Sequence, residues 1–397
     1  MKILQITSDY PPESLWGMGW HVYSLVNGLK KMVEKVDVAT ASKSRGLHEN
    51  IITSTHLDDQ QLLSPHKYEI FNSFDKFITW DKKLAQEILS QRETLNYDVI
   101  HCHNWMSWES TKIISAKTHS KTAVSLHFLQ RQYDSMDDSS QEPFHKQVYS
   151  IENNLFTSAD ALILFNDSQK DFLLDNYKVN ANKIYVIPQG VKISSYTYND
   201  LWKKRQETDE IRVVFVGRLA EDKGIRQLID VMHELHRNHK NVKLDIIGKG
   251  DLESEILTQK HPFITLHGYL KRPELEAVLI QGDVFCLPSK SETFGLAIVE
   301  AMQMGLPIVM NSGNYLPGLI VNGQEGFRIP LKHDSSNYTI DMDELEKMLE
   351  TLVTDPQIRY NLGKNAYHRA RLDYSKERFV RDTFDLYEKL CKNQKLT

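Results

Sequence analysis

The sequence predicts an α/β protein built from two doubly wound, Rossmann-like domains. Short β-branched runs alternate with longer amphipathic stretches along the chain, and the alternation is interrupted once, by a polar stretch, before it resumes. Strand–helix alternation implies right-handed βαβ crossovers and parallel sheets covered on both faces. The length of 397 residues also corresponds to about two or three domains.

The first half of the chain has the pattern of one such domain. Its expected strands are residues 2–7, 35–40, 98–103, 122–127, 160–165 and 183–188. Between them, residues 21–32 and 80–95 carry apolar side chains at three- and four-residue spacing, which predicts helices. The polar stretch 189–210 has no long apolar run and is predicted to be a linker and hinge.

The second half repeats the pattern and ends in a strongly periodic helix. Its expected strands are 211–217, 243–248, 264–268, 283–288 and 307–310, and its expected helices are 224–237, 273–281, 295–304 and 375–393. We therefore expect domains at 1–192 and 193–374, with 375–397 packing back on the first domain. Open α/β sheets bind ligands beyond the carboxyl ends of their strands, so the site is expected in a cleft between the domains.

Composition excludes several classes of protein. Hydrophobic residues at 41%, or about 45.5% when glycine is counted, and charged residues at 25% are ordinary globular values. A net charge of −5 gives no reason to expect a nucleic-acid partner. Cys102, Cys286 and Cys391 are far apart, without zinc-site spacing, and are expected to be reduced thiols. The amino-terminal residues lack the apolar run of a secretory signal or spanning helix, so a cytoplasmic protein is expected.

Two glutamates eight positions apart, Glu292 and Glu300, give the strongest chemical signal. Glu292 follows an expected strand, and Glu300 projects from the helix that comes next. The amides of Phe294, Gly295 and Leu296 would be unpaired donors at the start of that helix, suited to an anion or to sugar hydroxyls. Taken alone, the glutamates equally fit a solvated loop residue and an ion-paired helix residue.

The surrounding residues decide between these interpretations. The run SETFGLAIVEAMQMGLPIV (291–309) resembles the retaining family 4 glycosyltransferases of the GT-B fold. Six further segments resemble that family in the same order: DYPPESLWGMGWHVYSL (9–25), DVIHCHNW (98–105), ADALILFNDSQKDFL (159–173), KIYVIPQGV (183–191), VGRLAEDKGIRQLI (216–229) and IIGKGDLE (246–253).

The resemblance implies transfer of a sugar from a nucleoside diphosphate sugar, UDP favoured and GDP second, to an acceptor hydroxyl. The acceptor is left open among saccharides, lipid-linked molecules and small metabolites. No metal or cofactor is implied, because Arg218 and Lys223 would neutralise the diphosphate. Glu300 would bind the ribose, Glu292 would lie near the reacting carbon, and His127 would contact a sugar hydroxyl. Further donor contacts are expected at Gly17, Gly19, Gly248, Tyr269, Leu270, Phe294, Gly295 and Leu296.

The sequence departs from the family pattern at three places. Trp16 stands where a glycine is usual, on the side expected to bind the acceptor. Asn104 replaces an aspartate after His103, which weakens any acceptor role for this pair. In residues 312–327 the usual Gly-Gly-x-Pro-Glu run is altered at Asn314, Tyr315 and Gly318.

Other interpretations stay open. A nucleotide-sugar-binding subunit without activity would agree with Asn104 and the altered 312–318 loop. A nucleotide-sugar epimerase would share the architecture, whereas an NAD-dependent dehydrogenase lacks its G-x-G-x-x-G fingerprint. The acidic segment 133–140 is predicted to be an exposed loop, not a metal site. The lysine-rich helix expected at 29–35 is interpreted as a solvated face with at most peripheral membrane contact.

Overall fold

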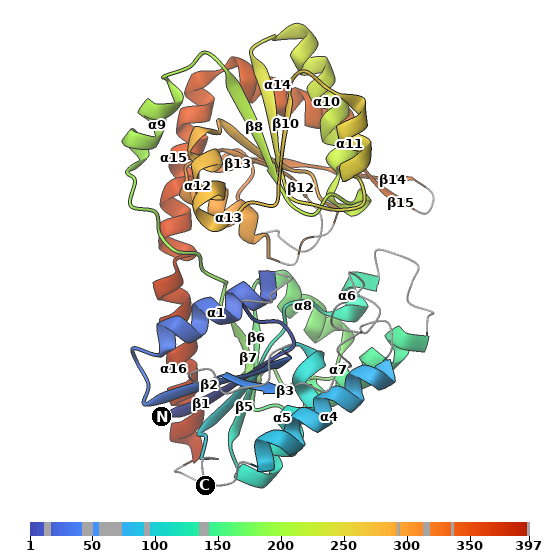
Figure 1. Cartoon of the computed structure of the whole chain (residues 1–397), viewed down its shortest axis with the longest axis vertical. Coiled ribbons are helices and arrows are strands. Elements are labelled where there is room, and N and C mark those ends of the chain that lie inside the picture. Colours follow the sequence, from blue (N-terminus) through green and yellow to red (C-terminus); the bar gives the residue numbers. More distant parts are fainter. Residues whose placement is uncertain are drawn as a thin grey trace. The chain divides into compact units, whose positions relative to one another are not determined.

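The computed structural model describes residues 1–11, 17–41, 51–54, 74–90, 96–134, 143–290, 292, 294–312, 318–334 and 337–394. The chain divides into two compact units, Met1–Gln189 with Lys376–Thr397, and Gly190–Ser375 (Figure 1). The sequence placed these boundaries after residues 192 and 374. Each unit is an α/β domain with its own parallel sheet.

The first unit contains a seven-stranded parallel sheet in the order β3-β2-β1-β4-β5-β6-β7. Its strands are β1 (Lys2–Thr7), β2 (Lys35–Ala41), β3 (Ile51–Ser54), β4 (Val99–His103), β5 (Lys121–Ser125), β6 (Ala161–Leu164) and β7 (Ile184–Val186). The strand order reverses between β1 and β4, and at such a point the loops beyond the strand ends diverge and leave a crevice. Six of these strands were expected from the sequence; β3 was not.

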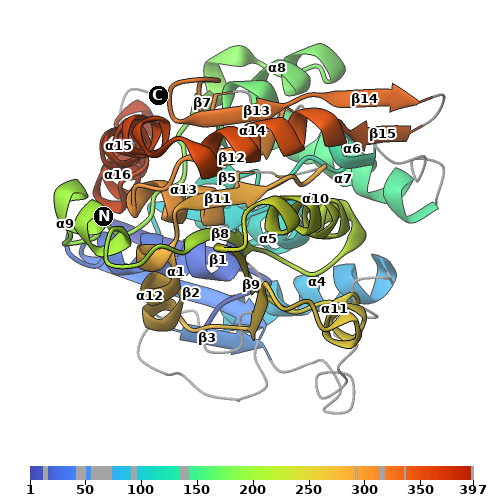
Figure 2. The same cartoon turned by 90° about the horizontal axis from the view of Figure 1, so that it is seen from above.

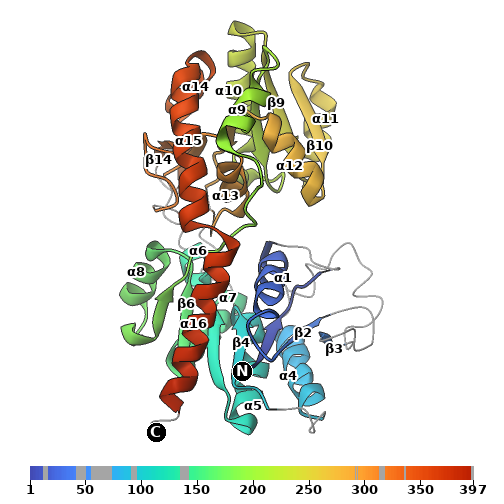
Figure 3. The same ribbon diagram turned by 90° about the vertical axis from the view of Figure 1, so that its left-hand side faces the viewer.

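Helices cover both faces of this sheet (Figure 3). They are α1 (Gly17–Leu29), α4 (Phe74–Ser90), α5 (Trp108–Thr118), α6 (Gln130–Asp134), α7 (Pro143–Ser158), α8 (Asp167–Asn176) and α16 (Lys376–Gln394). Leu4 and Ile6 belong to the core that α4, α5 and α7 cover. Alternate residues of a strand face opposite sides, so Gln5 lies on the other face, where its side chain contacts Tyr387 of α16. The expected return of the C-terminal helix to the first domain is confirmed.

The second unit repeats the topology with six parallel strands in the order β10-β9-β8-β11-β12-β13. They are β8 (Ile211–Val216), β9 (Val242–Ile247), β10 (Ile264–Gly268), β11 (Val284–Leu287), β12 (Ile308–Asn311) and β13 (Gly326–Ile329). A short antiparallel hairpin, β14 (Leu331–Asp334) and β15 (Asn337–Ile340), extends away from this sheet (Figure 2). The order reverses between β8 and β11, which makes their carboxyl ends the expected binding position.

The helices of the second unit lie on both faces of its sheet. They are α9 (Tyr198–Arg205), α10 (Ile225–Asn238), α11 (Glu253–Gln259), α12 (Arg272–Gln281), α13 (Leu296–Gln303), α14 (Met342–Thr354) and α15 (Pro356–Asp373). α10 has the expected amphipathic pattern, with Leu228, Met232 and Leu235 buried. The sequence analysis did not predict β13 or the hairpin.

The prediction of a linker at 189–210 is wrong for its second half, because Tyr198–Arg205 form α9. Thr197 caps this helix in a reciprocal capping box with Asp200. Leu201 is buried, and the guanidinium of buried Arg205 donates to the carbonyls of Gly305 and Met304. The polar composition concealed the helix because an arginine, rather than an apolar residue, provides part of its inward face.

The prediction of a lysine-rich helix at 29–35 is also wrong. α1 ends at Leu29, residues 30–34 form turns, and Lys35 begins β2. Lys35 forms an ion pair with Asp37. The lysines therefore do not form the helical basic face on which the idea of a peripheral membrane contact depended.

Candidate functional site

Three charged side chains predicted to bind the donor converge at the carboxyl ends of β8 and β11. Arg218 follows β8, and its guanidinium is 2.9 Å from a carboxylate oxygen of Asp222. Lys223 lies in the turn before α10, and its Nζ is 2.7 Å from Glu292 Oε1 and 3.5 Å from Asp222 Oδ2. Glu292 itself follows β11. Two cations and two carboxylates thus alternate where the strand order reverses.

Electrostatics keep Lys223 charged in this position. Burial alone lowers the pKa of its ammonium group, but the charge of Glu292 and its hydrogen bond outweigh that effect and hold the pKa above its ordinary value. Asp222 acts in the same direction. The Lys223 side chain is 15% exposed, so the ammonium is mostly withdrawn from water while its charge is retained.

The start of α13 adds backbone donors beside Glu292. Gly295 precedes the helix with φ of 76°, and no side chain caps this end. The helix begins without an acidic residue in its first turn. Its dipole and the amides before Ile298, whose own amide donates to the Gly295 carbonyl, are therefore available to a negatively charged ligand. Phe294 is buried, and its ring packs against Tyr374 with the ring centroids 5.9 Å apart. This packing helps to fix Phe294 just before α13.

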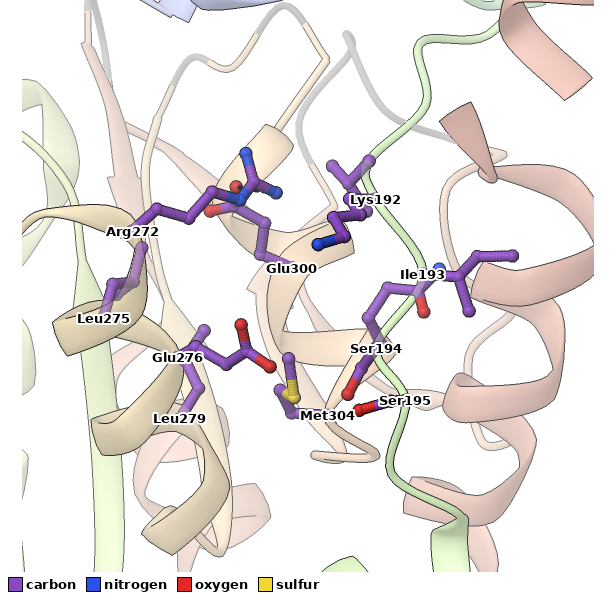
Figure 4. Close-up of a pocket in the computed structure, with 12 residues that line it drawn as sticks. Lys192, Ile193, Ser194, Ser195, Arg272, Leu275, Glu276, Leu279, Glu300 and Met304 are labelled. Atoms are coloured by element: carbon purple, nitrogen blue, oxygen red, sulfur yellow. Dashed lines mark ion pairs between the residues drawn. The ribbon is translucent and has the colours of Figure 1, made fainter. Parts of the chain in front are cut away.

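Glu300, the expected ribose ligand, lies on α13 and pairs with an arginine that the sequence analysis missed. A guanidinium nitrogen of Arg272, at the start of α12, is 3.0 Å from Glu300 Oε1. Both residues line a pocket of about 130 Å³ between α12, α13 and the segment Val191–Ser195 (Figure 4). Drug-sized ligands occupy pockets of roughly 300–1,000 Å³. This pocket therefore has room for only a small part of a nucleotide.

Burial raises the pKa of the Glu300 carboxyl, and the charge of Arg272 opposes that rise. Arg272→Ala is therefore expected to raise this pKa further. Ribose hydroxyls donate best to the ionised carboxylate, so UDP affinity should fall as the pH drops through the pKa, and the fall should begin at a higher pH in the variant. Calorimetric titration of UDP across a pH series measures this. UDP itself titrates identically with both proteins, so their difference isolates the protein group.

Arg226→Ala is the matched control, because Arg226 pairs with Glu221 and Glu255 and lies outside the pocket. Its pH profile should coincide with that of the unaltered protein. Coincident profiles for Arg272→Ala and the unaltered protein would show that Glu300 does not control nucleotide binding.

The loops after β9 and β10 hold the remaining predicted donor contacts of this unit. Gly248 follows β9, and Tyr269 and Leu270 follow β10. Tyr269 is 64% exposed, so its ring is open to a ligand. The amide of Gly248 donates to the carbonyl of Gly268, which fixes the two loops side by side.

Gly248→Ala is expected to destabilise the second unit by about 3–5 kcal/mol. Gly248 has φ of +136°, and a Cβ placed there would lie 1.8 Å from the carbonyl oxygen of Gly217. Chemical denaturation followed by circular dichroism measures the change. Gly318→Ala is the control, because its Cβ would meet nothing within 4 Å. Equal stability of both variants would contradict the close approach of Gly248 to the Gly217 carbonyl.

In the first unit, the predicted glycine loop leads into α1. Gly17 is its first residue and is exposed, while Gly19 is buried and its amide donates to Asp9 Oδ2 at 3.0 Å. A carboxylate thus already accepts from one of the amides that were expected to face the donor. Trp16 lies outside the described residues. So do Asn314 and Tyr315 of the altered 312–327 run and most of the acidic segment 133–140.

His127 and His103 meet in a buried chain of hydrogen bonds that also includes Gln5 and Gln189. His103 Nε2 is 2.9 Å from Gln5 Oε1, His103 Nδ1 is 3.1 Å from His127 Nε2, and His127 Nδ1 is 3.4 Å from Gln189 Nε2. An amide oxygen only accepts, so His103 carries its proton on Nε2. His127 must then donate from Nε2 and accept at Nδ1. Both of its ring nitrogens are engaged within the protein.

Burial keeps this histidine cluster neutral. It lowers the pKa of His21 and of His101 to about 3, and it lowers the pKa of His103 and His127 well below the ordinary value. His101 Nδ1 is 2.5 Å from Tyr387 Oη and its Nε2 is 2.8 Å from Ser125 Oγ. Neutral imidazoles can accept as well as donate hydrogen bonds.

Asn104 positions His127 through the backbone. Its side-chain oxygen accepts from the His127 amide at 2.7 Å and from the Phe128 amide at 3.4 Å. Asn104 is fully buried and has φ of 66°. Positive φ is uncommon for a residue with a side chain, and asparagine tolerates it better than most. The amide oxygen fulfils this structural function without the aspartate charge.

The structure thus gathers the predicted residues into two groups, one in each unit. Sequence reasoning missed Arg272 and the partners of the histidines, His21, His101, Gln5 and Gln189. The proximity of His101 to His103 could have been predicted, because the two residues are two positions apart in an expected strand and must share a face. Nothing local in the sequence pairs Arg272 with Glu300.

The helices of the described residues include none with the length and apolar composition that a membrane span requires.

Two Rossmann-ordered sheets, with two cations and two carboxylates at one strand-order reversal, define a two-domain α/β protein with a site suited to an anionic ligand. Family models identify the enzyme class. Residues 16–195 match the model described as Glycosyltransferase Family 4, and residues 199–369 match Glycosyl transferases group 1. The chain belongs to the family 4 glycosyltransferases with the GT-B fold, and it is a glycosyltransferase enzyme.

Individual relatives agree with this assignment. An uncharacterised glycosyltransferase of Methanocaldococcus jannaschii is 26% identical, with 98% of each chain covered. Sucrose-phosphate synthase of Thermosynechococcus elongatus superposes with a TM-score of 0.80 at 19% identity, covering 98% of this chain and 99% of that one. HepE of Anabaena, solved with UDP-glucose, superposes with a TM-score of 0.68 at 19% identity over 97% and 99%. At these identities the solved structures are similar in fold alone.

Proposed function

We propose that this enzyme transfers a sugar, with retention of anomeric configuration and without a metal ion, from a nucleoside diphosphate sugar to an acceptor hydroxyl. UDP is the favoured nucleotide and GDP the second choice. The observation that carries the proposal is the convergence of Arg218, Lys223 and Glu292 at the carboxyl ends of β8 and β11. The acceptor is a saccharide, a lipid-linked molecule or a small metabolite.

Stabilisation of the departing diphosphate is the main electrostatic task of this reaction. Lys223 and Arg218 bring two positive charges, and the uncapped start of α13 brings backbone amides. Together these groups supply the charge that a divalent ion supplies in other transferases. The two carboxylates of this cluster, Asp222 and Glu292, are each paired with a cation.

Glu292 has a different task, at the sugar. As a glycosidic bond to a diphosphate breaks, positive charge grows on the anomeric carbon, as in other oxocarbenium-like transition states. A carboxylate held by Lys223 can accept from sugar hydroxyls and stabilise that charge. We assign Glu292 no covalent role. The acceptor attacks from the face that the diphosphate leaves, and its proton passes to a phosphate oxygen, so the configuration is retained.

One observation supports a uridine nucleotide, and a second supports a ribonucleotide of either base. HepE of Anabaena, which has the same fold, was solved with UDP-glucose. Glu300 and the small pocket around it can accept the hydroxyls of a ribose once Arg272 moves aside. His127 remains the proposed contact for a sugar hydroxyl in the first unit, and one of its internal hydrogen bonds must then break.

A panel of nucleotide sugars tests the proposal. Chelator-treated enzyme is incubated, without acceptor, with UDP-glucose, UDP-galactose, UDP-N-acetylglucosamine and GDP-mannose, and free UDP or GDP is measured. We expect slow release from one donor, and no release in the Glu292→Gln variant. Interconversion of two intact donors would indicate an epimerase. Binding of donors without release, even after addition of simple sugar acceptors, would indicate a binding subunit without activity.

A further inference from the structure

Three buried histidines lie together in the first unit, and sugar transfer as proposed above uses only one of them, His127. His21 comes from α1, His103 ends β4, and His127 follows β5. Their exposed fractions are 4%, 0% and 7%. One ring nitrogen of each histidine lies within 4.8 Å of a ring nitrogen of the other two. Among the described residues, this is the group of three His, Cys, Asp or Glu side chains close enough to share a metal ion.

His21 provides the observation that hydrogen bonding within the protein does not explain. Its Nε2 is buried and has no hydrogen-bond partner. The ring is surrounded by His127, Phe165 and Phe379, with centroids 4.9, 5.3 and 4.6 Å away. A buried polar atom without a partner is unfavourable unless a ligand satisfies it.

The outer sides of the rings are held by carboxamides. Gln5 Oε1 accepts from His103 Nε2 at 2.9 Å, Gln189 lies 3.4 Å from His127 Nδ1, and Gln189 also hydrogen-bonds His21. A carbonyl or carboxylate typically orients a metal-binding histidine through the nitrogen that does not bind the ion, as Gln5 does for His103 here. His127 instead faces the amino group of Gln189, Nε2. This leaves His103 Nδ1 and His127 Nε2, already 3.1 Å apart, directed toward each other.

We propose that His21, His103 and His127 form a binding site for a divalent transition-metal ion, with Zn²⁺ as the best-fitting occupant. Three imidazoles without a carboxylate suit Zn²⁺, Co²⁺ or Ni²⁺ rather than Mg²⁺ or Ca²⁺. With Zn–N bonds of about 2.0–2.1 Å, tetrahedral ligand atoms are roughly 3.3 Å apart. The closest pair is near that spacing, and His21 would approach by side-chain rotation. A water or a small anion would complete the shell.

Binding requires one proton to move within the protein. His103 already presents an unprotonated Nδ1, whereas His127 carries its proton on Nε2. That proton shifts to Nδ1, and the carboxamide of Gln189 rotates so that its oxygen accepts it. The number of bound protons is unchanged. If the proposed function is right, the ion also removes His127 from the sugar, so it would inhibit transfer rather than support it.

Direct metal titration tests the site without reference to activity. Full-length protein is stripped with a chelator, desalted and titrated with ZnCl₂ by calorimetry, and with CoCl₂ by visible absorption. We expect one ion per chain and the absorption of tetrahedral Co²⁺. His21→Gln should weaken binding at least tenfold. Gln5→Ala, which removes the acceptor behind His103, should weaken it by about 10–100-fold.

His261→Gln is the matched control. His233 and His261 form another pair with ring nitrogens 3.1 Å apart, but both are on the surface. The proposal requires that His261→Gln still binds one ion, and this variant should fold normally because the His261 side chain is partly exposed at the surface. Absence of saturable binding in the unaltered protein would overturn the proposal. So would loss of the ion in His261→Gln, or unchanged affinity in a folded His21→Gln protein, with thermal unfolding as the check on folding.

Discussion

Glu292→Gln is expected to lower the rate of sugar transfer by about 10²–10³-fold while leaving UDP affinity unchanged or slightly higher. The substitution keeps the shape of the side chain but removes the negative charge proposed to face the anomeric carbon. It also releases Lys223, whose ammonium is 2.7 Å from Glu292 Oε1, for fuller contact with the diphosphate. Steady-state kinetics and UDP titration measure the two effects separately.

Glu346→Gln is the control for this experiment, because Glu346 is exposed on α14. It should leave both quantities unchanged. A Glu292→Gln enzyme with full activity would remove Glu292 from the reaction centre. A variant that lost UDP binding as well as turnover would assign Glu292 to nucleotide binding or to folding of the loop.

Lys223→Met is expected to reduce kcat/KM by about 10³-fold or more and to weaken UDP binding clearly. Methionine keeps most of the side-chain volume but removes the cation. The diphosphate then loses a charge-assisted contact, and Glu292 is left next to the donor phosphates without its partner. Two unfavourable effects add in the transition state, since the departing diphosphate gains negative charge there.

Lys347→Met controls for removal of a lysine. Lys347 forms an exposed ion pair with Glu344 on α14, and such pairs contribute about 0–1 kcal/mol to stability. Activity and UDP affinity should be unchanged in this variant. If Lys223→Met kept normal UDP affinity, the positive charge that stabilises the diphosphate would have to come from Arg218 and the start of α13 alone.

The two sheets were predictable because each strand carries its own signal. Residues 2–7 and 264–268 were placed to the residue, and other expected strands agree with the structure to within one or two positions. Short runs of β-branched residues fill buried parallel strands whatever the sequence around them. α9 was missed because it depends on partners distant in the sequence, with Arg205 bonded to carbonyls about a hundred residues further on.

The difference between local sequence signals and contacts distant in the sequence also explains which site residues could be predicted. Arg218, Lys223, Glu292 and Glu300 belong to contiguous motifs, and the strand order brings three of them together. Arg272 and His21 belong to no such motif. They matter through neighbours on other elements, Glu300 and the two histidines, and only the folded chain supplies those contacts. The facing of the two domains across a cleft remains a prediction.

Metal-independent cleavage of the donor with retention can be followed directly by NMR. Chelator-treated enzyme is mixed with the α-linked donor identified by the panel, and the anomeric proton of the released sugar is followed from the first minutes, before mutarotation. We expect the α-anomer to form first and the signal to disappear in the Glu292→Gln variant. Initial formation of the β-anomer, or a reaction that requires added metal, would contradict it.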